Sequence, residues 1–192
     1  MRRARSTLSP PVDVRDAAVA GVAGAVAYVA EMELDLALID HNAHDLVFLG
    51  GPFVGRRHGW AKPVGLAVHA ANGVNLGLAY AMLGERHLPG PPWWRGVVFA
   101  NVENAVLYPL TVLTDRYHTA IRDGRLDRYW RWPAFVQSVL RHVAYGAVLG
   151  IAYDRLRRRR GHCSLTTRNR RCVTPGDSIT PTGSNSNGAA VS

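Results

Sequence analysis

The sequence predicts an all-α fold, a four-transmembrane-helix bundle built from two tandem helical hairpins. Three observations predict it: four apolar stretches of membrane length, tryptophans at the starts of these stretches, and a motif repeated in the second and fourth. Composition alone would also suit a soluble protein, because 47% of the 192 residues are hydrophobic, 19% are charged and the mean hydropathy is -0.06. The charges, however, gather at the chain ends and between the apolar stretches, as in a membrane protein.

The four apolar stretches predict the spanning helices. Each is near the ~20 residues that an α-helix needs to cross the hydrocarbon core of a bilayer. Tryptophans, which favour the headgroup level, precede or open the last three stretches. On a soluble helical bundle these tryptophans would be half-exposed, but charged stripes would then run within the helices. The predicted helices are residues 16–39, 63–83, 94–113 and 133–153.

A basic, proline-containing lead, residues 1–15, precedes the first apolar stretch. This arrangement also fits a cleaved signal peptide, with Ala25-Val26-Ala27 as a small-residue cleavage site. Asp13 and Asp16 interrupt such a signal, and the apolar pattern continues well beyond Ala27. We therefore predict that the first stretch is a retained spanning helix.

The distribution of positive charge predicts the orientation in the membrane. The net charge is +9, and only one of the 23 basic residues, Lys62, is a lysine. With both termini in the cytoplasm, 14 basic residues lie on the inner side and 8 on the outer side, as the positive-inside rule requires. No nucleic-acid-binding motif is present, so the basic excess indicates a membrane surface and not a nucleic acid. The sequence thus predicts a multi-pass protein of the cell membrane, with both termini in the cytoplasm.

Residues 157–192 predict a basic segment followed by a disordered tail, which leaves residues 16–156 as the membrane domain. The arginines at 157–160 would lie among anionic lipid headgroups. From Gly161 onward the chain is rich in Ser, Thr, Asn, Gly and Pro and has too little apolar surface to fold. Cys163 and Cys172 match no zinc or redox spacing, so we expect unpaired thiols.

A repeat links the second and fourth predicted helices. Residues 69–80 read HAANGVNLGLAY and residues 142–153 read HVAYGAVLGIAY, with seven of the twelve positions identical. Residues four apart share one helix face, so each histidine lies in line with two glycines. Small residues at this spacing let a neighbouring backbone approach closely, which predicts helix packing at Gly73, Gly77, Gly146 and Gly150.

The repeat extends more faintly to the first and third predicted helices. Each copy then comprises two spans, an even number, so both hairpins have the same orientation in the membrane. The matching residues are Gly24-x-Val26-x4-Glu31 and Gly96-x-Val98-x4-Glu103.

The repeat also places ionisable side chains at similar depths. At 1.5 Å per residue, two glutamates and two histidines lie roughly 9–15 Å from the outer edge of the predicted spans. Such groups are costly in a membrane and normally face partners inside the bundle. We expect Glu31, His69, Glu103 and His142 to converge in one inward-facing layer that binds or relays a proton or cation, or that only specifies helix pairing. Polar neighbours of this layer are Asp35, Asn72, Asn104 and Arg141.

A second polar cluster, residues 40–45, follows the first predicted helix. Asp40, His41, His44 and Asp45 could hold a transition metal, although a solvated loop is the simpler interpretation because no complete ligand set of known spacing is present. The chain also lacks a nucleophile elbow, a Walker loop, a dinucleotide-binding fingerprint and a zinc-protease motif. An enzyme is therefore not the favoured class.

In this organisation the chain resembles small, uncharacterised four-helix bacterial inner-membrane proteins of the YagU-like kind. The resemblance covers residues 16–156 and implies an inner-membrane location without a known activity. The Arg-rich tail and the cluster at residues 40–45 have no counterpart in that pattern. The residues that carry the resemblance are His69-x3-Gly73-x3-Gly77-x2-Tyr80 and Arg141-His142-x2-Tyr145-Gly146-x3-Gly150.

Three further functions stay open at the level of sequence. His69 and His142 could ligate one haem b axially, with the adjacent glycines making room for the macrocycle. The cluster at residues 40–45 and the inner carboxylates could form a metal-dependent membrane enzyme. The bundle could also be a structural scaffold, alone or as a homo-oligomer in the lipid bilayer. The favoured prediction needs no cofactor.

Overall fold

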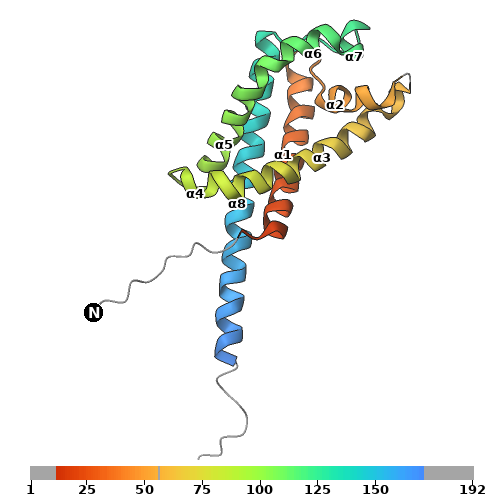
Figure 1. Cartoon of the computed structure of the whole chain (residues 1–192). Coiled ribbons are helices and arrows are strands. Elements are labelled where there is room, and N and C mark those ends of the chain that lie inside the picture. The colour runs from red at the N-terminus through yellow and green to blue at the C-terminus, as the bar shows by residue number, and fades with distance from the viewer. Residues whose placement is uncertain (1–11, 56, 171–192) are drawn as a thin grey trace, which may run out of the picture. The chain divides into compact units, whose positions relative to one another are not determined.

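The computed structural model describes residues 12–55 and 57–170, with side chains up to Arg160, and the regular elements in these residues are all helical. Four helical segments are long and apolar enough to cross a membrane: Val14–Leu38, His58–His87, Pro92–Tyr117 and Trp132–Arg160. The predicted all-α class with four apolar membrane helices is therefore confirmed (Figure 1). The chain divides into two units, Met1–Arg157 and Arg158–Ser192, and the first contains the packed helices.

The first two spans are α1 and a composite segment that contains α3. Helix α1 covers Val14–Leu38, and Asp13 is its N-cap. The Asp13 carboxylate accepts a hydrogen bond from the Asp16 backbone N–H at 3.1 Å. This cap satisfies one of the backbone donors that every helix start leaves free. The second span runs through η1, His58–Trp60, α3, Ala61–Ala79, the π-helical η2, Tyr80–Gly84, and α4, Glu85–His87.

The third and fourth spans are α5 with its continuation and α8. Helix α5, Pro92–Leu107, passes into the 3-10 turn η3, Tyr108–Leu110, and then into α6, Thr111–Tyr117. Pro109 lacks the N–H that an α-helix needs, so a tighter turn at this point follows from the sequence. Helix α8 covers Trp132–Arg170.

Helix α8 extends beyond the start of the predicted disordered tail at Gly161. Its last residues contain several arginines and a leucine, which favour a helix, and a single interior glycine costs only about 1 kcal/mol. The part of the tail prediction that falls on residues 171–192 lies outside the described residues.

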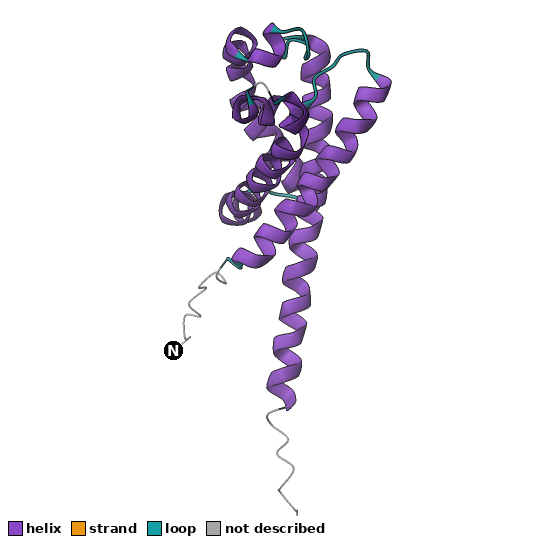
Figure 2. Cartoon of the chain, turned by 90° about the vertical axis from the view of Figure 1, so that its right-hand side faces the viewer, coloured by secondary structure: helices purple, strands orange, loops and turns teal. Residues whose placement is uncertain are grey.

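Two short helices occupy connections that the sequence prediction treated as loops. Helix α2, Asp45–Val54, packs against α3, and α7, Thr119–Arg122, follows α6. Helix α2 approaches α3 at backbone contact, because a methyl group at Gly50 would collide with the Ala61 carbonyl and one at Gly65 with the Leu46 carbonyl. Figure 2 shows the helices with the loops and turns that join them. An apolar helix of this length is too short to span a bilayer.

The four predicted packing glycines lie against the backbones of neighbouring helices. A methyl group at Gly73 of α3 would lie 2.9 Å from the Gly21 carbonyl oxygen of α1. In the same way, one at Gly146 of α8 would collide with the Gly96 carbonyl of α5. Gly77 and Gly150 meet the Ala17 and Pro92 carbonyls one turn further along. Only glycine permits this separation of the helix axes.

The outside of the helices is largely apolar, whereas several polar side chains are buried inside. Val26 is 64% exposed, Val102 57% and Leu66 50%. By contrast, Arg141 is 1% exposed and Gln137 is fully buried. This arrangement suits helices surrounded by hydrocarbon, where buried polar groups must find their partners within the protein.

Candidate intramembrane polar site

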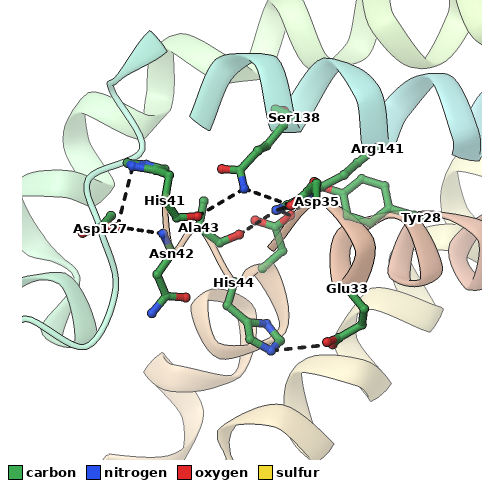
Figure 3. Close-up of polar contacts among 12 residues, drawn as sticks. Tyr28, Glu33, Asp35, His41, Asn42, Ala43, His44, Asp127, Ser138 and Arg141 are labelled. Atoms are coloured by element: carbon green, nitrogen blue, oxygen red, sulfur yellow. Dashed lines mark hydrogen bonds and ion pairs between the residues drawn. The ribbon is translucent and has the colours of Figure 1, made fainter. Parts of the chain in front are cut away.

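A buried arginine holds three segments of the chain together. Arg141 of α8 donates from Nε and Nη2 to the two carboxylate oxygens of Asp35 in α1, both at 2.6 Å. Its Nη1 donates to Asp45 Oδ2 at 2.6 Å and to the Ala43 carbonyl at 2.7 Å (Figure 3). The paired contact with Asp35 is the bidentate geometry that a guanidinium makes with a carboxylate. We call Asp35, Asp45 and Arg141 the arginine lock.

Two neutral side chains complete the arginine lock. The Tyr28 hydroxyl donates to Asp45 Oδ2 at 2.7 Å, and Gln137 Nε2 donates to Asp35 Oδ1 at 2.9 Å and to the His41 carbonyl at 3.1 Å. Buried charges are tolerated only when they are paired and hydrogen-bonded, as they are here. Two carboxylates face one guanidinium, so the lock carries one excess negative charge when both carboxylates are ionised.

A histidine and a glutamate from different helices meet next to the arginine lock. His142 Nδ1 lies 2.7 Å from the Ser138 backbone carbonyl, which can only accept a hydrogen bond, so this nitrogen carries a proton. His142 Nε2 then lies 3.3 Å from Glu103 Oε2 of α5. A neutral ring would turn its lone pair toward a carboxylate, which is repulsive. A proton shared by the imidazole and the carboxyl group would remove this repulsion.

The second histidine of the repeat shares a neighbour with the first. The Tyr28 ring centroid lies 4.7 Å from that of His69 and 5.3 Å from that of His142. His69 is 8% exposed, and its Nε2 has no hydrogen-bond partner among the residues that the structure describes. Leaving a buried polar atom without a hydrogen bond costs about 1–3 kcal/mol of stability. A hydrogen-bond partner for this nitrogen would therefore be favourable.

A cavity of about 310 Å³ lies between these groups. Its polar wall includes Tyr28, His69, Glu103, Asn104 and His142, and its apolar wall comes from α2, α3 and the end of α5. The exposed lining residues mark its mouth, and they are Asn72, Leu107 and Leu110. All three belong to helical segments of membrane length, so the mouth faces the region that hydrocarbon would occupy.

The structure brings together most of the residues of the predicted layer. His69, Glu103 and His142 line the cavity, as do Asn72, Asn104 and Arg141, whereas Asp35 belongs to the arginine lock. Glu31 does not line the cavity and interacts instead with Asp35, one turn further along α1. Tyr28 occupies the place expected for Glu31.

The rotation of α1 explains the exchange of Glu31 for Tyr28. The backbone contact with Gly73 is made by Gly21, not by the Gly24 of the predicted repeat. Counted from this contact, Tyr28 follows Gly21 by seven residues, as Glu103 follows Gly96. A displacement of three residues along a helix turns a side chain by about 60°, so Glu31 points away from the cavity.

The side chains of the polar cluster at residues 40–45 interact with several separate partners. His41 Nδ1 lies 3.6 Å from Asp127, His44 Nε2 lies 3.8 Å from Glu33, and Asp45 belongs to the arginine lock. Asp40 lies at an exposed turn. Within residues 12–55 and 57–170, the structure shows no group of three or more His, Cys, Asp or Glu side chains placed to hold a metal ion. Burial lowers the pKa of His44, and the Lys62 charge lowers it further.

The sequence analysis missed three of the residues that build the site. Tyr28 and Gln137 bond the arginine lock, and Ser138 donates to Asn104 Oδ1 at 2.8 Å. One signal for Gln137 was available, because Gln137, Arg141 and Tyr145 are four apart and share one face of α8. For Tyr28 the sequence carried no such signal, since an interior tyrosine of a spanning helix is normally interpreted as packing.

Four apolar membrane-length helices around a polar cavity place this chain in the class of all-α, multi-pass membrane proteins. A family model matches residues 11–164, and the chain belongs to that family, the family of unknown function DUF6789. No curated protein and no solved structure matches the chain. The YagU-like resemblance therefore stays a prediction.

Proposed function

We propose that this protein binds and exchanges a proton within the membrane, at the pair formed by His142 and Glu103. The observation that carries the proposal is the 3.3 Å separation of His142 Nε2 and Glu103 Oε2, while Nδ1 is already committed to the Ser138 carbonyl. Such a pair can hold a proton between two groups that can each release it. The pair also lines the cavity, so other groups on the cavity wall can exchange a proton with it.

The groups that face the pair can support such an exchange. Tyr28 from α1, His69 from α3 and Tyr145 from α8 surround it, and all three line the same cavity. The arginine lock, which includes the adjacent Arg141, carries one excess negative charge when both of its carboxylates are ionised, and this charge favours retention of a proton nearby. Ionisable residues inside a bundle commonly mark proton or ion pathways.

Proton flux into liposomes tests the proposal. Purified protein would be reconstituted into vesicles that contain a pH-sensitive dye, and the decay of an imposed pH gradient would be followed. We expect wild-type protein to accelerate the decay, and Glu103→Gln and His142→Gln to abolish that acceleration. Glu33→Gln removes the same charge from an exposed carboxylate and should behave as wild type. Equal flux through the Glu103→Gln and wild-type proteins would refute the proposal, provided that both elute as the same species in gel filtration.

We further propose a tandem-hairpin topology in the cell inner membrane, with both termini in the cytoplasm. The close glycine contacts of α1 with α3 and of α5 with α8 support the hairpins, and the distribution of arginines supports the orientation. The basic end of α8 would then meet anionic lipid headgroups. Reporter fusions at Ser192 and near Gly55 should report opposite sides of the membrane. Reporters on the same side would contradict this topology.

Haem binding is a second candidate, since His69 and His142 both line the cavity. Axial ligation would require His142 Nε2 to leave Glu103, which makes proton binding the better supported function. An absorption spectrum of the purified protein decides between them, because axial histidines on haem iron produce an intense Soret band.

A further inference from the structure

We infer that the cavity is a binding site for a small amphipathic amine, with a primary or secondary ammonium group between His69 and Glu103 and an apolar body toward the mouth. The inference rests on the proposed function to the extent that it uses the same Glu103 carboxylate. It names a class of ligand beyond the proton. Three independent features of the cavity lead to it.

The first feature is an unsatisfied acceptor. The His69 ring interacts with the Ala25 backbone, and in a neutral ring whose other nitrogen donates there, Nε2 can only accept. This nitrogen, Nε2, has no partner in the described part of the chain, although the side chain is only 8% exposed and lines the cavity. A ligand N–H would supply the missing donor. A carbonyl or ether oxygen could not.

The second feature is the charge of the cavity wall. The pair of Glu103 and His142 is neutral when it holds one proton, and Arg141 compensates only one of the two carboxylates of the arginine lock. When both of these carboxylates are ionised, one negative charge is left over in a region of low dielectric constant. Such a wall attracts a cation and repels an anion far more strongly than an exposed surface would.

The third feature is the position and the chemistry of the mouth. Leu107 is 47% exposed and Leu110 54%, and both flank the mouth within a membrane-length segment. Phe48, Leu49 and Leu76 continue the apolar wall inward. A ligand that enters here comes from the bilayer, so it needs an apolar body. A cavity of about 310 Å³ has room for a body such as one aromatic ring with a short chain.

The three features together distinguish the amine from other ligands. A neutral apolar compound would suit the mouth but leave His69 Nε2 and the excess charge uncompensated. A quaternary ammonium compound would compensate the charge but lacks an N–H for Nε2. A phenylalkyl amine satisfies all three.

Equilibrium dialysis of the full chain in detergent tests the inference, with radiolabelled phenethylammonium as the probe at one fixed pH. Three comparison compounds vary one feature each: propylbenzene is neutral, 3-phenylpropanoate is anionic, and phenethyltrimethylammonium has a charge without an N–H. Empty micelles correct for partition into detergent. We expect saturable binding of phenethylammonium, at least tenfold weaker binding of the quaternary analogue, and no saturable binding of the other two.

Variants locate the bound amine. Glu103→Gln and His69→Phe should each weaken phenethylammonium binding at least tenfold, and Glu33→Gln should leave it unchanged. Because His69→Phe could disturb packing, His69→Gln serves as the second variant, and thermal unfolding reports whether each protein is intact. Equal saturable binding of propylbenzene, or undiminished binding by intact Glu103→Gln protein, would overturn the inference.

The outcomes separate this inference from the proposed proton exchange. Proton flux without saturable amine binding would overturn the amine site alone. Amine binding with the expected loss in Glu103→Gln, but no proton flux, would refute proton exchange and support the amine site.

Discussion

The helix pair α1 and α3 and the helix pair α5 and α8 use the same backbone contact to support different chemistry. In each pair two glycines meet at the crossing, Gly21 with Gly73 and Gly96 with Gly146, and a histidine lies one turn before the second glycine. The neighbour of that histidine differs. His69 lies against the Tyr28 ring, whereas His142 faces the Glu103 carboxylate.

The residue before each histidine differs as well. Arg141 precedes His142 and forms the arginine lock, while the half-buried Val68 precedes His69. The comparison shows that close glycine packing determines where side chains meet and leaves their chemistry free to vary. Nε2 of His69 has no hydrogen-bond partner in the described part of the chain, whereas Nε2 of His142 lies 3.3 Å from Glu103 Oε2. A cavity between two unlike histidines is the result.

Substitution of Arg141 should produce the largest loss of stability, because Arg141 forms the arginine lock and α3 has no arginine at the matching position before His69. Arg141→Leu would leave Asp35 and Asp45 buried without a counter-charge, which typically costs about 3–5 kcal/mol of unfolding free energy. Denaturation of the purified protein in detergent measures this change in unfolding free energy. The control is Arg155→Leu, an exposed arginine of the same helix, which should change stability by less than about 0.5 kcal/mol. Similar stability of the two variants would show that the lock contributes nothing.

Substitution of the crossing glycines tests whether the two pairs are equivalent. Gly146→Leu and Gly73→Leu should both destabilise the fold by about 1–3 kcal/mol or more, because the added side chain meets backbone atoms that cannot move aside. Gly59→Leu is the matched control, since nothing lies within 4 Å of a methyl group at that position. A large loss of stability at only one of the two crossings would show that the two helix pairs do not depend equally on close glycine packing.

Loss of the Tyr28 hydroxyl should lower the stability by a smaller amount. It tests the residue that contacts both histidines. Tyr28→Phe keeps the ring against His69 and His142 but removes the donor to Asp45, and a hydrogen bond to a charged group contributes about 1.5–3 kcal/mol. Tyr117→Phe, at an exposed tyrosine, controls for the loss of a hydroxyl. Equal unfolding free energies for the two variants would contradict the role of Tyr28.

The smallest effect concerns His44, in the connection that follows α1. Burial lowers its pKa from 6.5, so the folded protein resists its protonation more than the unfolded chain does. Its contribution to stability is therefore complete above about pH 6.5 and is lost as the pH falls toward the lower folded value. His44→Gln should flatten the acid side of the pH–stability profile, whereas His58→Gln, at an exposed histidine, should not. An unchanged slope in His44→Gln would contradict the assignment.

The helices could be predicted because their signals are local. Apolar stretches and flanking tryptophans each act within a few residues, and the predicted spans agree with the helical segments apart from their ends. Helix α2 was not predicted, because its ten residues are too few to span a membrane. Its role becomes clear only where Gly50 and Gly65 bring it against α3.

The sequence by itself determined the four apolar helices, the glycines that can bring them into contact and the histidines carried on the same faces. Only the tertiary structure decided that Gly21 and not Gly24 makes the crossing in α1, and therefore that Tyr28 and not Glu31 reaches the cavity. It likewise decided that Asp45, from a connection, joins Asp35 on Arg141. The reason is physical. Hydropathy and spacing define which face of a helix is apolar or small, but the rotation that selects one turn of that face over the next depends on backbone contacts between residues far apart in the chain.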